Sequence, residues 1–392
     1  MSFVESDERQ ALRAAVSSLA ARYGPAYYRE KARSGKYLSE LWTEAGELGY
    51  LGVNLPEEYG GGGGGIGDLA AVLEELSAAG CPTLMAVVSP AICGTVLSRF
   101  GTPEQQRRWL PGIASGRQIF AFAITEPDAG SNAHNITTTA RPDGDGWVLS
   151  GRKTFISGVD VADAVLVVAR TEDAGSGRLR PALFVVPTGT PGFEAQRIPM
   201  DLVSPDHQFG LFFDDVRLPS DSLVGEPESG MLQLFAGLNP ERIMAAALSS
   251  GSARFALDRA VEYAGQREVW GVPIGAHQGL AHPLAQIKVE VELARLMTGK
   301  AAFLYDSADA ATVRAASVDA GEAANMAKYA AAEANVRAVD QAVQTLGGNG
   351  FASEFGLGAA IVTARLGRIA PVSREMVLNF VAQHSLGLPK SY

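Results

Sequence analysis

The chain has 392 residues, of which 47% are hydrophobic and 19% are charged, and its 33 basic and 43 acidic side chains give a formal net charge of −10. This apolar content is enough for a sizeable core and excludes a disordered chain. The acidic balance excludes a general nucleic-acid-binding surface, because such a surface needs a concentrated basic face. No run of 18 apolar residues is present, which excludes a transmembrane helix.

The two cysteines, Cys81 and Cys93, are twelve residues apart, which fits neither a disulfide framework nor a metal-binding knuckle. The N-terminal segment is charged and has the pattern of a helix rather than that of an apolar signal sequence. We therefore expect both thiols to be buried in a protein of a reducing compartment, and we predict a cytoplasmic location.

Residues 1–117 are predicted to form an N-terminal α-helical domain. Apolar side chains recur there at helical spacing, as in the series Leu69, Val72, Leu73 and Leu76. The run Gly60–Gly65 is typical of a flexible surface turn between two helices, because consecutive glycines favour no regular element. A phosphate-binding loop is the weaker alternative, since no Lys-Ser/Thr pair follows the glycines.

Residues 118–226 change to short runs rich in branched and aromatic side chains, separated by turn clusters such as Asp143–Gly146. No helical segment lies between these runs, so we predict an antiparallel barrel or sandwich as the middle β domain. The expected strands are Ile119–Ile124, Trp147–Leu149, Val165–Val168, Leu183–Val186 and Phe209–Phe213.

Residues 227–392 return to the helical period, with segments near 231–265, 283–309, 312–346 and 360–386 each long enough for a bundle helix. The three parts together predict an α+β multidomain fold. It consists of an N-terminal helical domain, a central antiparallel β-barrel or sandwich, and a C-terminal four-helix bundle.

The common signatures of metal, nucleophile and Rossmann chemistry are missing. There is no HExxH, CxxC, GxSxG or GxGxxG, and the five histidines do not have the spacing of metal ligands. If the chain is an enzyme, a cofactor held in another way carries its difficult chemistry.

Two segments of the middle domain carry polar groups suited to a heterocycle edge or a phosphate. The segment 123–132 ends a strand and opens a glycine-containing loop with the hydroxyls of Thr125 and Ser131. In the segment 151–158, Phe155 and Ser157 are two apart and therefore on the same face of a strand. Taken alone, the two segments are better explained as a capped turn and a core aromatic than as a ligand site.

These segments, with three others, resemble the motifs of the acyl-CoA dehydrogenase family. The family patterns are L-P-E-E-Y-G-G, A-x-T-E-P-x-A-G-S-D, G-x-K-x-W-I-T/S, R-x-x-F-G-x-x-I followed by Q, and Q-x-x-G-G-N-G. In chain order, they correspond to Leu55–Gly61, Ala123–Asn132, Gly151–Ser157 with Phe155 in place of tryptophan, Arg267–Ile274 with Gln278, and Gln344–Gly350. The resemblance covers essentially the whole chain.

The resemblance implies FAD bound between the middle and C-terminal domains, an acyl-CoA substrate, an electron-transfer flavoprotein as electron acceptor, and a homotetramer built as two dimers. Thr125 would bond the pyrimidine edge of the flavin, and Ser157 would lie near its N5 atom. The other implied cofactor residues are Phe122, Ile124, Gly130, Ser131, Phe155, Ile156 and Trp270, with Arg267, Gln278, Gln344, Gly347 and Gly348 supplied by a neighbouring subunit. Ser131, Asn239 and Arg242 occupy positions that contact acyl-CoA in relatives.

The implied reaction forms a trans-2,3 double bond and needs a carboxylate to remove the α-proton. Many relatives carry this glutamate in Y-E-G-T, but here Pro371 or Arg374 falls on that place, and Glu375 matches a downstream residue that faces the adenosine half of FAD. The isovaleryl-CoA and long-chain branches instead use an E-R pair on the first long helix of the C-terminal domain.

Glu241 and Arg242 match that E-R pair, so we assign Glu241 as the base. The sequence Asn239-Pro240-Glu241 is also typical of a helix start, where the helix dipole would lower the pKa of the acid. Burial must then outweigh the dipole.

Two other functions remain open on the same fold. One is an acyl-CoA-oxidase-like or flavin-monooxygenase-like enzyme, in which O₂ reaches the reduced flavin. The other is a non-catalytic subunit of a hetero-oligomer, which the altered Y-E-G-T region would explain. The thioester carrier could be CoA or an acyl carrier protein.

Overall fold

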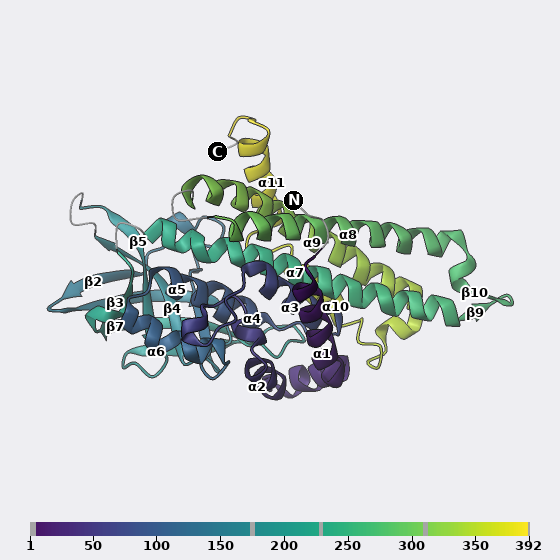
Figure 1. Cartoon of the computed structure of the whole chain (residues 1–392), viewed down its shortest axis with the longest axis horizontal. Helices are drawn as coiled ribbons and strands as arrows, with labels where there is room; N and C mark the ends of the chain where they lie inside the picture. Colours follow the sequence, from purple (N-terminus) through teal and green to yellow (C-terminus); the bar gives the residue numbers. More distant parts are fainter. Residues whose placement is uncertain (1–4, 173–176, 227–229, 309–312, 391–392) are drawn as a thin grey trace.

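The computed structural model describes residues 5–172, 177–226, 230–308 and 313–390. Helices, then a sheet, then helices follow one another along the chain, which confirms the predicted fold class (Figure 1). Among the residues that the structure describes, no helix combines the length and apolar character needed to cross a bilayer.

The N-terminal helices pack around one apolar core. The predicted helical series Leu69, Val72, Leu73 and Leu76 lies on α3 and is buried there. Side-chain caps begin two of the helices: Ser6 accepts from the backbone of Arg9 at α1, and Thr102 forms a capping box at α6. The elements are α1 (Asp7–Ser34), α2 (Ser39–Glu47), α3 (Ile66–Ala78), α4 (Leu84–Ala86), the π-helical segment η3 (Val87–Gly94), α5 (Thr95–Phe100) and α6 (Pro103–Ala114).

The glycine run is a fixed loop rather than the flexible turn predicted from its composition. Successive backbone N–H groups of Gly61, Gly62, Gly63 and Gly64 donate to carbonyl oxygens of the segment 52–56 at 2.9 to 3.0 Å. A Cβ on Gly61 would lie 2.2 Å from the Leu55 carbonyl oxygen. Glycine is needed here for close backbone approach, which its composition alone does not reveal.

The strands of the middle part form one sheet in the order β6-β7-β3-β2-β4-β5-β8, with β1 also paired to β4. Most neighbouring strands are antiparallel, as predicted, but the sheet is mixed, because β1 runs parallel to β4 and β2 meets β4 in parallel at one residue pair. The strands are β1 (Phe120–Ala123), β2 (Thr139–Asp143), β3 (Gly146–Ser157), β4 (Ala164–Glu172), β5 (Leu179–Pro187), β6 (Phe193–Ile198), β7 (Gln208–Leu218) and β8 (Leu223–Val224).

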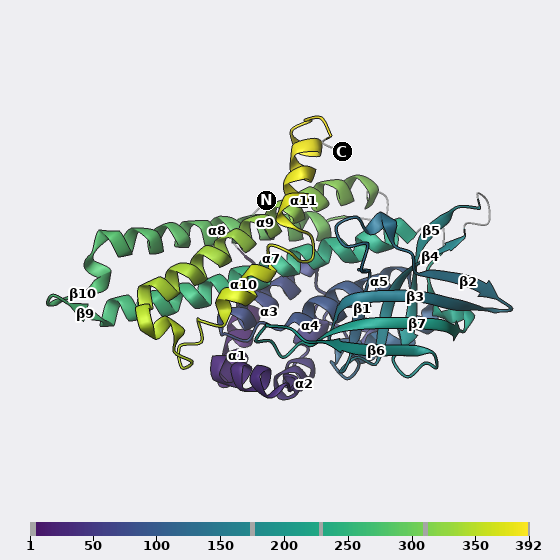
Figure 2. The same cartoon turned by 180° about the vertical axis from the view of Figure 1, so that it is seen from behind.

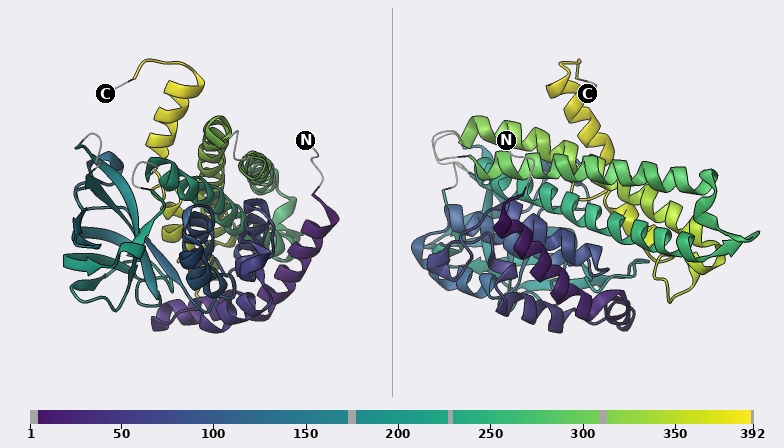
Figure 3. Two further views of the ribbon diagram at one scale, coloured as in Figure 1. Left: turned by 60° about the vertical axis from the view of Figure 1, so that its left-hand side comes forward. Right: turned by 45° about the vertical axis from the view of Figure 1, so that its right-hand side comes forward.

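Strand β4 shows how the sheet joins the helices. Its residues alternate between two cores: Leu166 and Val168 pack with the helical core, whereas Val165 and Val167 pack within the sheet's own core. A strand that is buried on both faces reads as a continuous apolar run, as this one does. The sheet lies to one side of the helices (Figure 3).

Three long helices dominate the C-terminal part. They are α7 (Gly230–Gln266), α8 (Gln278–Asp306) and α9 (Val313–Leu346), and they run along the long axis of the molecule (Figure 1). The short hairpin of β9 (Glu268–Val269) and β10 (Val272–Pro273) joins α7 to α8 at the end of this axis opposite the sheet (Figures 1 and 2).

The fourth predicted bundle helix is broken. In place of one helix over 360–386, the chain forms α10 (Ala360–Leu366) and α11 (Arg374–Phe380), which projects away from the long helices (Figure 2). Pro371 has no backbone N–H and cannot continue a helix, and the Ser373 hydroxyl caps the new helix by accepting from Met376.

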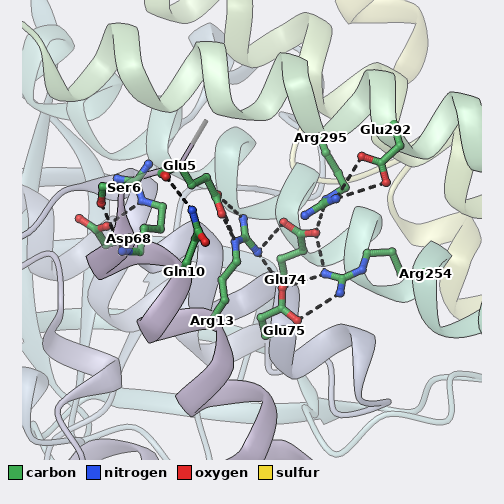
Figure 4. Close-up of polar contacts among 11 residues, drawn as sticks. Glu5, Ser6, Gln10, Arg13, Asp68, Glu74, Glu75, Arg254, Glu292 and Arg295 are labelled. Atoms are coloured by element: carbon green, nitrogen blue, oxygen red, sulfur yellow. Dashed lines mark hydrogen bonds and ion pairs between the residues drawn. The ribbon is translucent and has the colours of Figure 1, made fainter. Parts of the chain in front are cut away.

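A cluster of ion pairs ties the N-terminal helices to α7 and α8 (Figure 4). Glu74 and Glu75 of α3 are buried, and each faces Arg254 of α7, at 2.8 and 2.9 Å respectively. Arg13 of α1 reaches Glu75 at 2.8 Å, and Arg295 of α8 reaches Glu74. Separating these buried charges would be strongly destabilising, so the cluster holds α7 against α3.

Candidate active site

Glu241 lies in the interior of α7, not at a helix start. The helix begins at Gly230, so the first-turn dipole does not act on this carboxylate. Pro240 cannot donate to the carbonyl of Ala236, and the hydroxyl of Tyr305 on α8 donates to that oxygen instead, at 2.8 Å. The helix can therefore carry a proline directly before the predicted base without an unsatisfied carbonyl.

The Glu241 carboxylate is partly exposed and lies beside Cys93 of η3. Burial raises the pKa of Glu241 to about 7, against the opposing charges of Arg242 and Lys328. Within the described ranges of the chain, no hydrogen bond or salt bridge joins this carboxylate to another residue. It is therefore a carboxylate that can be reached from outside and that takes up a proton near neutral pH.

Two cations flank Glu241. Arg242 donates to the side-chain oxygen of buried Asn239 at 2.9 Å, which fixes the guanidinium beside the acid. Lys328 of α9 is fully buried and donates to the backbone carbonyl of Val372. Burial lowers the pKa of Lys328 to about 8 and the neighbouring charge of Arg242 lowers it as well, whereas Glu375 and Glu241 oppose the shift.

The segment between α10 and α11 contains Pro371, one of the two residues that the resemblance aligns with the common Y-E-G-T base. Arg368 and Arg374 reach Glu333 of α9 at 2.6 and 3.6 Å, so α9 holds both ends of this segment. Glu375 follows it, is exposed, and pairs with Arg374 at 3.1 Å. Its pKa is lowered by a hydrogen bond to its own backbone and by Arg374. Glu375 is thus a solvated, already ionised acid, which makes it a weaker candidate base than Glu241.

The loop after β1 is held by a buried ion pair. Lys153 of β3 donates to Glu126 at 2.9 Å and to the carbonyl of Ile124 at 3.0 Å. Glu126 also accepts from the backbone of Thr137 and Thr138. Although burial raises the pKa of Glu126, the hydrogen bonds from Lys153 and Thr138 lower it to about 2. The Thr125 carbonyl accepts from Thr154, which places the predicted flavin residue Thr125 beside β3.

The predicted ring-contacting residues differ in what they expose. Phe155 sits at a register shift of β3 with φ 56°, and 57% of its surface is open. Ser157 is partly open, whereas Ile156 packs into the sheet's own core with 2% exposed. The side chain of Ile156 is therefore not available to a ligand, and its role as a cofactor residue stays a prediction that concerns its backbone. Phe122 and Ile124 pack against the helical core, and Gly130 and Ser131 lie in the exposed loop.

A residue that the sequence did not single out faces Ser157. Gln208, the cross-strand partner of Ser157 at the start of β7, donates from Nε2 to the Ser157 hydroxyl oxygen at 2.8 Å. Its Oε1 lies 3.2 Å from the same hydroxyl. The pairing depends on strand register, and no motif in the sequence marks it.

The second set of predicted cofactor residues lies at the other end of the molecule. Its members are exposed and cluster where α7, the β9–β10 hairpin and α9 end, and the Tyr263 hydroxyl links this end of α7 to Asn349 at 3.2 Å. Trp270 has φ 55° and is 89% exposed. A single chain thus does not bring this second set close to the predicted flavin residues of the sheet. The second set comprises Arg267, Trp270, Gln278, Gln344, Gly347 and Gly348.

The exposed groups suit a flavin dinucleotide. Phe155 and Trp270 are exposed aromatic residues at positive φ. Trp270 stands in the two-residue turn between β9 and β10, where positive φ is usual, and Phe155 stands at the register shift of β3. A hydroxyl beside Phe155 matches a heterocycle edge, and the exposed guanidinium of Arg267 matches a pyrophosphate. Fold and site together define the class of three-part, flavin-dependent dehydrogenases.

Comparisons with known proteins agree along the whole chain. Models of the acyl-CoA dehydrogenase N-terminal, middle and C-terminal domains match residues 6–117, 121–216 and 228–386. The acyl-CoA dehydrogenase FadE12 of Mycobacterium tuberculosis (strain ATCC 25618 / H37Rv) is 64% identical over 391 residues, covering 100% of this chain and 99% of that protein.

Two solved structures are similar throughout. Butyryl-CoA dehydrogenase from Megasphaera elsdenii has a TM-score of 0.89 at 28% identity, covering 98% of this chain and 100% of that one. A Mycobacterium smegmatis glutaryl-CoA dehydrogenase in complex with FADH2 has a TM-score of 0.88 at 26% identity, covering 99% and 96%. The chain belongs to the acyl-CoA dehydrogenase family, whose members are flavin-dependent enzymes. The family, the enzyme class and the FAD cofactor predicted from the motifs are confirmed.

Proposed function

We propose that the chain is an FAD-dependent acyl-CoA dehydrogenase that converts a saturated acyl-CoA to the trans-2-enoyl-CoA with Glu241 as the base. The observation that carries the proposal is a partly exposed glutamate in the middle of α7 whose carboxylate no described residue pairs with and whose pKa is raised to about 7. Such an acid is ionised in part at neutral pH and is a strong enough base for a thioester α-proton. The common base position offers no carboxylate, since either Pro371 or Arg374 falls on it.

The chemistry divides between the cofactor and the chain. Bound FAD supplies the acceptor for the hydride that leaves the β-carbon. Glu241 takes the α-proton on a carboxylate oxygen, and the electron pair of that C–H bond becomes the new double bond. Arg242 keeps a positive charge beside the acid, and Cys93 contributes an apolar, protonated thiol because burial raises its pKa well above the usual range and Glu241 adds to this.

The residues that would hold the ligands follow from their placement. Thr125 and Ser157 would bond the ring, and Phe155, Phe122 and Ile124 would wall it. The fixed loop over Glu126 would present Gly130 and Ser131 to the ligands. Ser131, Asn239 and Arg242 would contact the acyl-CoA; the hydrogen bond between Asn239 and Arg242 supports a shared role for that pair.

A second copy of the chain would complete the cofactor site, with Arg267, Gln278, Gln344, Gly347 and Gly348 reaching the dinucleotide of its neighbour. The exposed apolar stripe on α8 supports this assembly, because its members are spaced as one helix face and are each at least half exposed. We propose a homotetramer built as two dimers. The stripe residues are Val289, Leu293, Leu296 and Phe303.

The testing experiment is anaerobic bleaching of the flavin by a panel of acyl-CoAs and matching acyl-pantetheines, with the chain purified alone. Bleaching by at least one thioester supports the dehydrogenase, and the panel reports the carrier and the chain length. No bleaching by any of them would favour a non-catalytic subunit. We expect the reduced enzyme to pass electrons to an electron-transfer flavoprotein in the cytoplasm without forming peroxide. Rapid reoxidation by O₂ with peroxide formation would favour the oxidase-like alternative.

A further inference from the structure

The hydroxyl of Ser157 has a fixed partner on its inner side. Ser157 and Gln208 stand opposite each other at the ends of β3 and β7, and the backbone N–H of Gly158 donates to the carbonyl of His207 at 2.9 Å just beyond them. The His207 ring is itself held by Asp160 at 2.7 Å. The backbone beside the pair is thus fixed, which keeps the two side chains opposite each other.

The geometry leaves the hydroxyl proton two choices. Gln208 Nε2 donates to Ser157 Oγ at 2.8 Å, which occupies one lone pair of the hydroxyl oxygen. The hydroxyl proton can turn inward to Gln208 Oε1, but that distance is 3.2 Å, longer than the usual ~2.7–2.8 Å of an O–H···O bond. It can also turn outward, where Ser157 is partly open. An external acceptor therefore competes well for this proton.

The ability of the Ser157 hydroxyl proton to turn inward or outward matters for hydride transfer. A partner of the flavin nitrogen that receives the hydride must donate a hydrogen bond before transfer and accept one afterwards. With the amide beside it, the hydroxyl can donate outward in the first state. In the second it can accept from outside while its own proton turns to Gln208 Oε1. An apolar residue at position 208 would stop this exchange, because the inward acceptor would be lost.

We propose that Gln208 is a positioning residue for the Ser157 hydroxyl, allowing it to change from donor to acceptor as the bound flavin becomes reduced. The inference rests on the proposed function, which places Ser157 beside the reacting nitrogen. Gln208 acts through Ser157 and does not itself touch substrate or cofactor. Its effect belongs to the reduced state, so its loss makes reduction of the flavin less favourable as well as slower.

The test compares Gln208→Met, Ser157→Ala and the double variant in the FAD-loaded full-length protein. The first readout is the two-electron potential of bound flavin without substrate, and the second is the anaerobic bleaching rate. We expect Gln208→Met to shift the oxidised–reduced equilibrium about tenfold, which is about 30 mV lower for a two-electron couple. Bleaching should slow by a similar factor. The double variant should equal Ser157→Ala, because the two residues act as one unit.

A matched control is Gln196→Met, an exposed position on the neighbouring strand β6, which should leave both readouts unchanged. If Gln208→Met does not fold, Gln208→Asn decides, since it keeps the amide but withdraws it by one methylene and should still lower the potential. A wild-type potential in either folded variant, or additive effects in the double variant, would overturn the inference. Failure of the proposed function would give a different result, because no acyl-CoA would then bleach the wild-type flavin. The measured potentials would still decide the role of Gln208.

Discussion

Two acidic residues, one in the loop after β1 and one in α7, show how the same side chain serves opposite purposes in this protein. Glu126 has 3% of its surface exposed and accepts from Lys153, Thr137 and Thr138, and its pKa is about 2 although burial alone would raise it. Glu241 is without hydrogen-bond donors among the described residues, and burial raises its pKa to about 7. Hydrogen bonds and an ion pair keep the Glu126 carboxylate charged. Burial without such partners among the described residues instead raises the pKa of Glu241, so that it can take up a proton near neutral pH.

The largest effect on stability should come from removing the ion-pair partner of Glu126. We expect Lys153→Met to destabilise the fold by about 3–5 kcal/mol, because it leaves the Glu126 carboxylate buried and uncompensated. Thermal unfolding of the apoprotein measures this loss. Adding Glu126→Gln to Lys153→Met should restore part of the stability, since the buried charge is then gone. If Lys153→Met were as stable as the wild type, the ion pair between Lys153 and Glu126 would not stabilise the fold.

The pH dependence of catalysis tests the raised pKa of Glu241. Glu241 must be ionised to act as a base, so kcat/KM should rise about tenfold per pH unit below pH 7 and level off above it. A carboxylate with an ordinary pKa would reach its plateau about two to three units lower. The profile is measured with one thioester across the range in which the flavin stays bound. A flat profile from pH 5.5 to 8 would contradict the raised pKa.

Removing the buried cation behind Glu241 should move that profile. Because the charge of Lys328 lowers the pKa of Glu241, Lys328→Met should shift the rising limb to higher pH by about one unit or less. Lys328→Arg keeps the charge and should shift it less. Lys288→Met on α8, at an exposed position, is the matched control and should leave the limb unmoved. A limb that stays in place in Lys328→Met would show that the two groups are not coupled.

The smallest effect is expected at the neighbouring exposed acid. Glu375→Gln should change the bleaching rate less than about twofold, because its carboxylate is solvated and paired with Arg374. The same stopped-flow traces used for the wild type measure it. A loss of a hundredfold or more would transfer the role of base from Glu241 to Glu375.

Periodicity and motifs predicted much of this molecule. The helical spacing of Leu69 and Leu76 and the branched run of β4 are local patterns, so the sequence of helical, sheet and helical parts could be read directly. The E-R pair singled out Glu241 as the candidate base, a role that stays a prediction. The hydrogen bond from Tyr305 that accommodates Pro240 and the burial of Lys328 depend on how distant helices pack, which a local pattern does not encode.

The same limit explains the corrections. The glycine run looked mobile because its hydrogen-bond acceptors, in residues 52–56, are chosen by tertiary folding. The parallel pairing of β1 with β4 is set by tertiary strand pairing, which no local pattern marks. Gln208 was missed for that reason too, since its partner Ser157 lies 51 residues away in the chain.

Rapid anaerobic mixing of the Glu241→Gln variant with a thioester that bleaches the wild-type flavin tests most directly whether Glu241 removes the proton. The variant should bind FAD normally, because the amide keeps the size of the side chain. We predict that its flavin reduction slows by about 10²–10⁴-fold, the usual contribution of a positioned base. Bleaching at the wild-type rate, in a variant with full FAD content, would contradict the assignment.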